Sequence, residues 1–281
     1  MTATTAGRPT RQQPLGARVN RWLGRNAIRI YAVLGFTYLF IPVAYTFAFS
    51  FNNSGKSNYA WEGFTLSKWQ NPCGAPAVCS ALKNSLEIGL LATAIATVLG
   101  TMIAFALARH RFRGRTATNL TIFLPMATPE VVLGASLLAL FLNLRVNLGF
   151  NTIVIAHVMF CISFVVVTVK ARIAGLDPRL EQAAMDLYAN EWQTFRRITL
   201  PLVAPGILAA ALLAFSLSFD DFIITNFNSG SVNTFPKFVY ISSLRGIPAQ
   251  ANVIASAMFF LALVAVLVGQ AVTAGRKKQR A

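Results

Sequence analysis

Charged side chains are scarce in this sequence, and acidic ones are the scarcest. Only 12% of the 281 residues are charged, and Asp and Glu together number 9. A soluble domain carries roughly 25% charged residues. The composition therefore excludes an ordinary soluble globular domain.

Residues that build metal centres and active sites are also few. Histidine occurs only at His110 and His157, and no metal-ligand spacing is present. The sequence contains no Ser/His/Asp set that predicts an active site and no glycine-rich phosphate loop ending in Lys-Ser/Thr. We therefore expect no catalytic residue, no metal and no cofactor bound by this chain, and we assign both histidines to packing or hydrogen bonding.

What the sequence has in abundance is apolar runs. Hydrophobic residues make up 55% of the chain, and its mean hydropathy is +0.56. Runs of 20 or more apolar residues are long enough to cross ~30 Å of hydrocarbon. The sequence predicts an all-α membrane protein with one domain, about 28–275, of six transmembrane helices: 28–51, 83–108, 118–143, 150–170, 203–226 and 251–274.

The basic residues show how these spans are oriented. If the segments between spans alternate sides, 18 of the 25 Lys and Arg residues share the side of both termini, six lie opposite and Arg29 lies at a boundary. This asymmetry places both termini in the cytoplasm. Residues 1–27 are expected to form a basic, disordered cytoplasmic tail, and 276–281 a second basic tail. Because the charges cluster at the ends of spans, the net charge of +16 does not indicate nucleic acid.

The first external loop carries two of the three cysteines, Cys73 and Cys79, in the segment CGAPAVC. In an oxidising compartment a disulfide can close this short loop. Two free thiols are the alternative. Cys161 lies within an apolar span, where a small packing residue is the simplest interpretation.

A polar segment, 180–207, separates the fourth and fifth spans. Asp177-Pro178 precedes it, and proline is favoured at the first position of a helix. Leu180, Ala183, Ala184 and Leu187 then share one helical face. Such a short helix fits a groove on a partner protein, although a solvated connection between spans would also be polar.

This segment resembles the EAA loop of ABC importer permeases of type I. Gln182, Ala183, Ala184, Asp186, Leu187 and Ala189 follow the pattern E-A-A-x-D-L-G-A, and Leu200-Pro201 and Pro205-Gly206 match its end. Two residues depart from the pattern: Gln182 replaces the glutamate, with Glu181 beside it, and Tyr188 replaces the glycine. We expect an ordinary helical or extended backbone at Tyr188, in place of the turn that a glycine permits.

The resemblance covers about residues 28–275 and implies a complete transport assembly. The loop, about 177–201, would hold the coupling helix that docks on a cytoplasmic ATPase. The residues implied in coupling are Glu181, Gln182, Ala183, Ala184, Asp186, Leu187 and Tyr188. The implied partners are a second permease, expected to be a different chain, two ATPase subunits that bind ATP and Mg, and an external substrate-binding protein. The implied location is the bacterial inner membrane.

Within that family the sequence is most similar to the second permease of spermidine/putrescine systems. Four segments carry this similarity: Asn84-Ser85-Leu86, residues 108–114 (ARHRFRG), Pro129-Glu130 with Gly134, and residues 218–222 (SFDDF). The resemblance implies a polyamine as cargo.

Three carboxylates within the spans agree with a cationic cargo. Glu130 follows Pro125 and Pro129, which interrupt the third span, and Asp220 and Asp221 lie in the fifth span. An ionised carboxylate within a bilayer costs several kcal/mol, so such residues indicate a functional pathway. Phe219 and Phe222 could add cation–π attraction to an ammonium group.

A structural role for the acids is the alternative. Adjacent helical residues point about 100° apart, so Asp220 and Asp221 cannot both face one small site. One of them could cap a neighbouring helix or pair with Arg245 or Lys237.

Other functions remain open at this point. An ABC importer of iron(III), an aminophosphonate or another solute would share these features. An ATP-independent secondary transporter or channel would need no ATPase, and a membrane-embedded enzyme would need a catalytic set that the sequence lacks.

Overall fold

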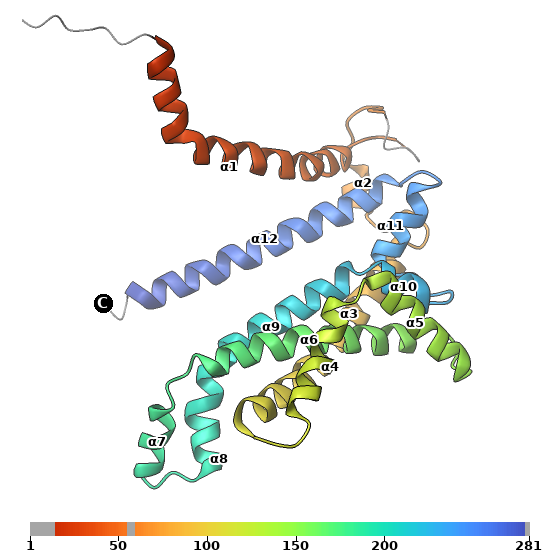
Figure 1. The fold of residues 1–281 in the computed structure, drawn as a ribbon. Coiled ribbons are helices and arrows are strands. Elements are labelled where there is room, and N and C mark those ends of the chain that lie inside the picture. The colour runs from red at the N-terminus through yellow and green to blue at the C-terminus, as the bar shows by residue number, and fades with distance from the viewer. Residues whose placement is uncertain (1–14, 55–59, 279–281) are drawn as a thin grey trace, which may run out of the picture.

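The computed structural model describes residues 15–54 and 60–278, and its regular elements are helices throughout these ranges (Figure 1). The long ones are α1 (Leu15–Phe49), α3 (Val78–Arg109), α6 (Phe150–Ala174), α9 (Leu200–Asp220) and α12 (Ala249–Lys278). The shorter ones are α2 (Ser67–Gln70), α4 (Arg115–Ala127), α5 (Glu130–Asn143), α7 (Arg179–Asp186), α8 (Glu191–Thr194), α10 (Ile223–Asn228) and α11 (Phe235–Ser243), with a π-helical turn, η1 (Phe195–Thr199), between α8 and α9.

The predicted all-α membrane architecture is confirmed. Five of the described helices are long and apolar enough to cross a membrane, and α4 with α5 makes a sixth if this bent pair counts as one span. The predicted fifth span, 203–226, was wrong at its external end. There α9 stops at Asp220 and α10 forms a separate short helix.

The expectation of a disordered tail over 1–27 was wrong for the part that the structure describes, because α1 begins at Leu15. Leu15, Val19 and Trp22 recur at helical spacing, and extending an existing helix needs no new nucleation. Residues 1–14 and 279–281 lie outside the described part of the chain, while α12 continues to Lys278.

The core is built from α3, α6 and α9, which pack along most of their lengths. Small residues on one face of α3 allow the close approach: Ala92, Ala96, Gly100 and Ala104 are buried. A Cβ built at Gly100 would lie 2.7 Å from Cγ1 of Val165 on α6. Glycine is therefore required at this crossing.

The two ends of the helix bundle carry different short elements. Figure 1 shows α7, α8 and the end of α12 toward one side, and α2, α10 and α11 toward the other. This is the arrangement expected if the coupling loop and the C-terminus share the cytoplasmic side.

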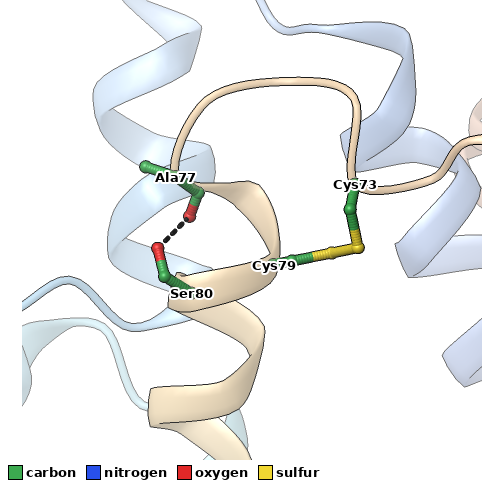
Figure 2. The surroundings of a disulfide bond; sticks show 4 residues. All are labelled: Cys73, Ala77, Cys79 and Ser80. Carbon is green, nitrogen blue, oxygen red and sulfur yellow. Dashed lines mark hydrogen bonds between the residues drawn. A yellow bond between two sulfur atoms is a disulfide. The ribbon is translucent and has the colours of Figure 1, made fainter.

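A disulfide joins Cys73 to Cys79, the two cysteines of the loop that the sequence predicts to be external (Figure 2). Cys79 lies in the first turn of α3, and the chain enters this helix through Ala77, whose φ is 64°. The Ser80 hydroxyl donates a hydrogen bond to the Ala77 carbonyl at 3.0 Å. The bridge thus holds the loop against the start of α3, whereas Cys161 is a buried free thiol.

Candidate functional site

A cavity of about 340 Å³ opens where α5, α6, α9 and α10 meet. It brings together Glu130, Asp220 and Asp221, the three carboxylates that the sequence placed within spans. Its full lining is Glu130, Phe160, Ser216, Leu217, Asp220, Asp221, Phe222 and Ile223. Small-molecule sites commonly occupy about 300–1,000 Å³, so the cavity is large enough for a small cargo.

Glu130 reaches this cavity because the chain breaks between α4 and α5. Thr128 and Pro129 are extended, with ψ of 133° and 134°, and the two helices meet at 109°. Proline removes a backbone donor and disfavours a helical residue before it. Glu130 begins α5 and is exposed, so its carboxylate lies at the favourable, positive end of a helix dipole.

Asp220 and Asp221 are separated by a second break, between α9 and α10. Asp221 is extended, with ψ of 121°, and its carboxylate accepts the backbone N–H groups of Thr225 at 2.8 Å and Ile224 at 3.3 Å. It therefore caps the start of α10, one of the alternatives that the sequence left open. Asp220 is exposed and lines the cavity.

His157 on α6 completes a buried polar cluster around Asp221. Its Nε2 lies 3.2 Å from Asp221 Oδ2 and 3.0 Å from Thr225 Oγ1, and its Nδ1 lies 2.7 Å from Ser218 Oγ. These contacts fit a neutral His157 ring with its proton on Nε2. The Nε2–H group then points to Asp221 and Thr225, and the Ser218 hydroxyl donates to Nδ1. These four residues join α6 to the break between α9 and α10.

The sequence indicated no Ser/His/Asp set, yet Ser218, His157 and Asp221 are in contact. The Ser218 side chain is buried, and so is His157. A nucleophile must be reached by its substrate, so this set stabilises the fold rather than forming a catalytic site. A histidine within an apolar span was the one sign of the cluster in the sequence.

The two basic residues considered as partners for the acids, Lys237 and Arg245, do not pair with them. Lys237 is buried and donates to Ser229 Oγ at 2.6 Å and to the carbonyls of Gly230 and Val232 at 3.2 and 3.3 Å. Among the described residues, no ion pair joins Arg245 or Lys237 to Asp220 or Asp221. Both proposed pairings were therefore wrong.

Of the two aromatic residues proposed for the pathway, only one lines the cavity. Phe222 lines the cavity and packs on Tyr240 with ring centroids 4.3 Å apart. Phe219 is not part of that lining and stacks on Phe215 at 5.8 Å. Phe160 on α6, which the sequence did not single out, supplies the second aromatic wall.

The first part of the predicted coupling segment forms α7, and most of its side chains are exposed. The Asp177 carboxylate accepts the Arg179 N–H at 2.9 Å, next to Pro178 at the start of the helix. The exposed residues include Gln182, Ala183, Asp186, Leu187 and Tyr188, whereas Ala184 is half-buried. This surface is available to a partner along the whole helix.

The expectation of an ordinary helical or extended backbone at Tyr188 was wrong. Its φ is 63°, and its side chain is 99% exposed. Tyr188 N–H donates to the Met185 carbonyl and Ala189 N–H to the Ala184 carbonyl, which is the left-handed helix ending that glycine usually supplies. The turn is thus kept with a tyrosine, because the hydrogen bonds of the ending outweigh a local cost of about 1–2 kcal/mol.

Glu181 differs from its neighbours on α7 because its side chain contacts Arg109 on α3 and Thr199 before α9. Its carboxylate accepts two N–H groups of Arg109, one of them at 2.6 Å, and the hydroxyl of Thr199. The Arg109 guanidinium lowers the pKa of the Glu181 carboxyl below its usual value, although partial burial opposes the shift. The carboxylate is therefore ionised at neutral pH.

Comparison with known proteins places the chain in a family. Residues 96–275, more than half of the chain, match the family described as "Binding-protein-dependent transport system inner membrane component". The spermidine/putrescine transport system permease protein PotC of Haemophilus influenzae is 34% identical over 256 residues, covering 91% of this chain and 98% of the relative. The putrescine transport system permease protein PotI of Escherichia coli K12 is 38% identical over 232 residues, covering 80% and 82%.

Solved structures agree in fold. A bacterial ABC transporter that imports the acidic polysaccharide alginate is similar with a TM-score of 0.62 at 15% identity, covering 92% of this chain and 99% of that one. The MetNI methionine ABC transporter is similar with a TM-score of 0.58 at 14% identity, covering 69% and 94%.

The chain belongs to the family of binding-protein-dependent inner membrane components, the permeases of ABC importers. It is a transport subunit of the inner membrane and not an enzyme. This membership sets aside the channel and the secondary transporter.

Proposed function

We propose that this permease carries a polyamine such as spermidine or putrescine into the cytoplasm through the cavity that Glu130 and Asp220 line. The observation that carries the proposal is the meeting of two exposed carboxylates at two helix breaks in one cavity. Carboxylates favour a cation and disfavour an anionic cargo such as an aminophosphonate.

The form of the site suits an extended cation. A polyamine has two or more ammonium groups joined by apolar methylenes, and Glu130 on α5 and Asp220 on α9 offer acceptors from two different helices. Phe160 and Phe222 line the same cavity. An aromatic face attracts an ammonium group by about 0.5–2 kcal/mol. Asp221 contributes by holding the α9–α10 break, so its role is to position Asp220.

The names of two relatives support the same cargo. The proteins from Haemophilus influenzae and Escherichia coli are described as spermidine/putrescine and putrescine permeases. Neither description assigns this chain one polyamine over the other, and the cavity holds no feature that separates them.

The assembly follows from the family. A second permease of a different sequence would complete the pathway, two ATPase subunits would bind ATP and Mg, and an external binding protein would deliver the cargo. The exposed face of α7, with Gln182, Ala183, Asp186, Leu187 and Tyr188, is the surface we assign to ATPase docking.

The test measures uptake of radiolabelled spermidine and putrescine by the whole complex carrying Asp220→Asn or Glu130→Gln. Loss of one charged acceptor should raise the apparent KM roughly tenfold, since a charged hydrogen bond contributes about 1.5–3 kcal/mol. The control is Glu87→Gln, because Glu87 is an exposed carboxylate on α3 that pairs with Lys83 at 3.6 Å, away from the cavity. Unchanged uptake in both cavity variants contradicts the assignment, as does equal loss in the control.

A further inference from the structure

The coupling helix α7 has one point of side-chain hydrogen bonding to the membrane helices, and that point is Glu181. Across the described residues, the side-chain hydrogen bonds that leave α7 for another element are those of Glu181 with Arg109 and Thr199. The other exposed residues of α7 project into the cytoplasm.

The partners of Glu181 belong to two different helices of the core. Arg109 is the last residue of α3, and Thr199 is the last residue of η1, directly before α9. In the chain, Arg109 precedes Glu181 by 72 positions and Thr199 follows it by 18. One carboxylate therefore joins the coupling helix to both α3 and α9, and α9 ends at Asp220 in the proposed pathway.

Cavities lie on both sides of the contact of Glu181 with Arg109 and Thr199. One cavity of about 190 Å³ and another of about 670 Å³ are each lined by Arg109, Glu181 and Thr199. The three side chains thus form a wall between two hollows. The backbone of α7 packs mainly on α8 and η1, whereas its contact with α3 is a bidentate guanidinium–carboxylate pair, which is directional.

We propose that the Arg109–Glu181–Thr199 cluster is the link through which movement of the coupling helix reaches α3 and α9. The inference rests on the proposed docking of α7 on an ATPase. Glu181 is a positioning residue in this account: the exposed face of α7 receives the movement, and the half-buried Glu181 passes it on. The chain connections on either side of α7 lead to α6 and, through α8 and η1, to α9, whereas the direct side-chain link to α3 runs through Arg109.

The first test compares Glu181→Gln, Glu181→Arg and the exchange Arg109→Glu/Glu181→Arg in the reconstituted complex with its ATPase and binding protein. Both single variants should co-purify with the ATPase and hydrolyse ATP. The amount of polyamine imported per ATP should fall roughly fivefold or more, the usual range of coupling between sites. The exchange should recover most of the ratio, while Glu87→Gln keeps the wild-type ratio.

A second readout needs no cargo. The substitution Ser216→Cys, at an exposed residue of the carboxylate cavity, reports whether the nucleotide state reaches the pathway. In an otherwise wild-type complex, trapping with ATP and vanadate should change the rate at which this thiol reacts with a thiol reagent. In Glu181→Arg this change should disappear, and in the exchange variant it should return.

The two tests distinguish a failure of the Arg109–Glu181–Thr199 link from a failure of the polyamine proposal. Absence of polyamine uptake by the wild-type complex contradicts the cargo, and the Ser216→Cys readout then decides the link. Wild-type ratios and a wild-type thiol response in Glu181→Arg overturn the link. Loss of the ATPase from the single variants also overturns it, because Glu181 would then act in docking, and failure of the exchange to restore coupling contradicts the pair.

Discussion

Asp220 and Asp221 are neighbours in the chain, but the break between α9 and α10 gives their carboxylates opposite environments. Asp220 is exposed in the cavity, whereas Asp221 is buried and bonded to His157 and the start of α10. A residue-by-residue account of transport must therefore treat the two acids separately. One is free to meet a cation, and the other is already satisfied.

This difference predicts unequal effects of substitution on the free energy of unfolding. Asp221→Ala leaves the His157 N–H and two backbone N–H groups without their acceptor, which should lower the free energy of unfolding by roughly 2–4 kcal/mol. Asp220→Asn should change it by less than about 0.5 kcal/mol, as exposed substitutions usually do. Thermal unfolding of the purified complex measures both, and equal melting temperatures for the two variants would contradict the assignment.

Tyr188 predicts a gain of stability from a single substitution. Its left-handed backbone is unfavourable for a side chain with a Cβ, so Tyr188→Gly should stabilise the end of α7 by about 1 kcal/mol. Hydrogen exchange of the segment 184–189 should slow in the variant. The control is Leu187→Gly, which should speed exchange because Leu187 has a negative φ of −88°. Faster exchange in Tyr188→Gly would show that the turn needs the tyrosine.

Some of these residue roles could be predicted from sequence, and some could not. The carboxylates were visible because charge is rare in apolar spans. His157 was not assigned to Asp221 because its contacts lie 61–68 positions away along the chain. Glu181 was assigned to the ATPase surface with its neighbours, although helical spacing alone does not show which face of α7 meets α3.

At the level of elements, the two helix breaks have different causes. Pro125 and Pro129 predicted the interruption between α4 and α5, and the structure bends there by 109°. The break after Asp220 contains no proline or glycine. This break depends on Asp221, which caps the start of α10. A single continuous helix over 203–226 has no helix start at this point for Asp221 to cap.

The close crossing of α3 and α6 predicts that a larger residue at Gly100 destabilises the packing of these two helices. A Cβ at Gly100 would lie 2.7 and 2.8 Å from two atoms of Val165, whose branched side chain is stiff. Gly100→Ala should therefore destabilise the protein by about 1–3 kcal/mol through overpacking. Gly35→Ala on α1 is the matched control, because a Cβ at that position would meet no neighbouring atom within 4 Å.

Thermal unfolding again checks this pair of alanine variants. The control should be neutral or more stable by up to about 1 kcal/mol, since alanine favours a helix. A Gly100→Ala protein as stable as the Gly35→Ala protein would show that α3 and α6 can move apart at no cost.

At the scale of the whole molecule, the exposed apolar side chains of the long helices indicate a protein that lies within a lipid bilayer. Large apolar side chains on α1 and α12 are exposed, including Leu39, Phe40, Leu261 and Val266. Apolar faces of this kind suit the hydrocarbon of a bilayer. The sequence predicted the helical spans well, because span length is a property of the chain alone. It could not fix where spans bend or which side chains meet.

The central claim is that this chain, with its partners, imports a polyamine at the expense of ATP. The most direct measurement is uptake of radiolabelled spermidine and putrescine by proteoliposomes that hold the complete complex. We predict uptake that requires both ATP and the binding protein, with each polyamine competing for the other. A complex that hydrolyses ATP and imports neither polyamine would contradict the claim.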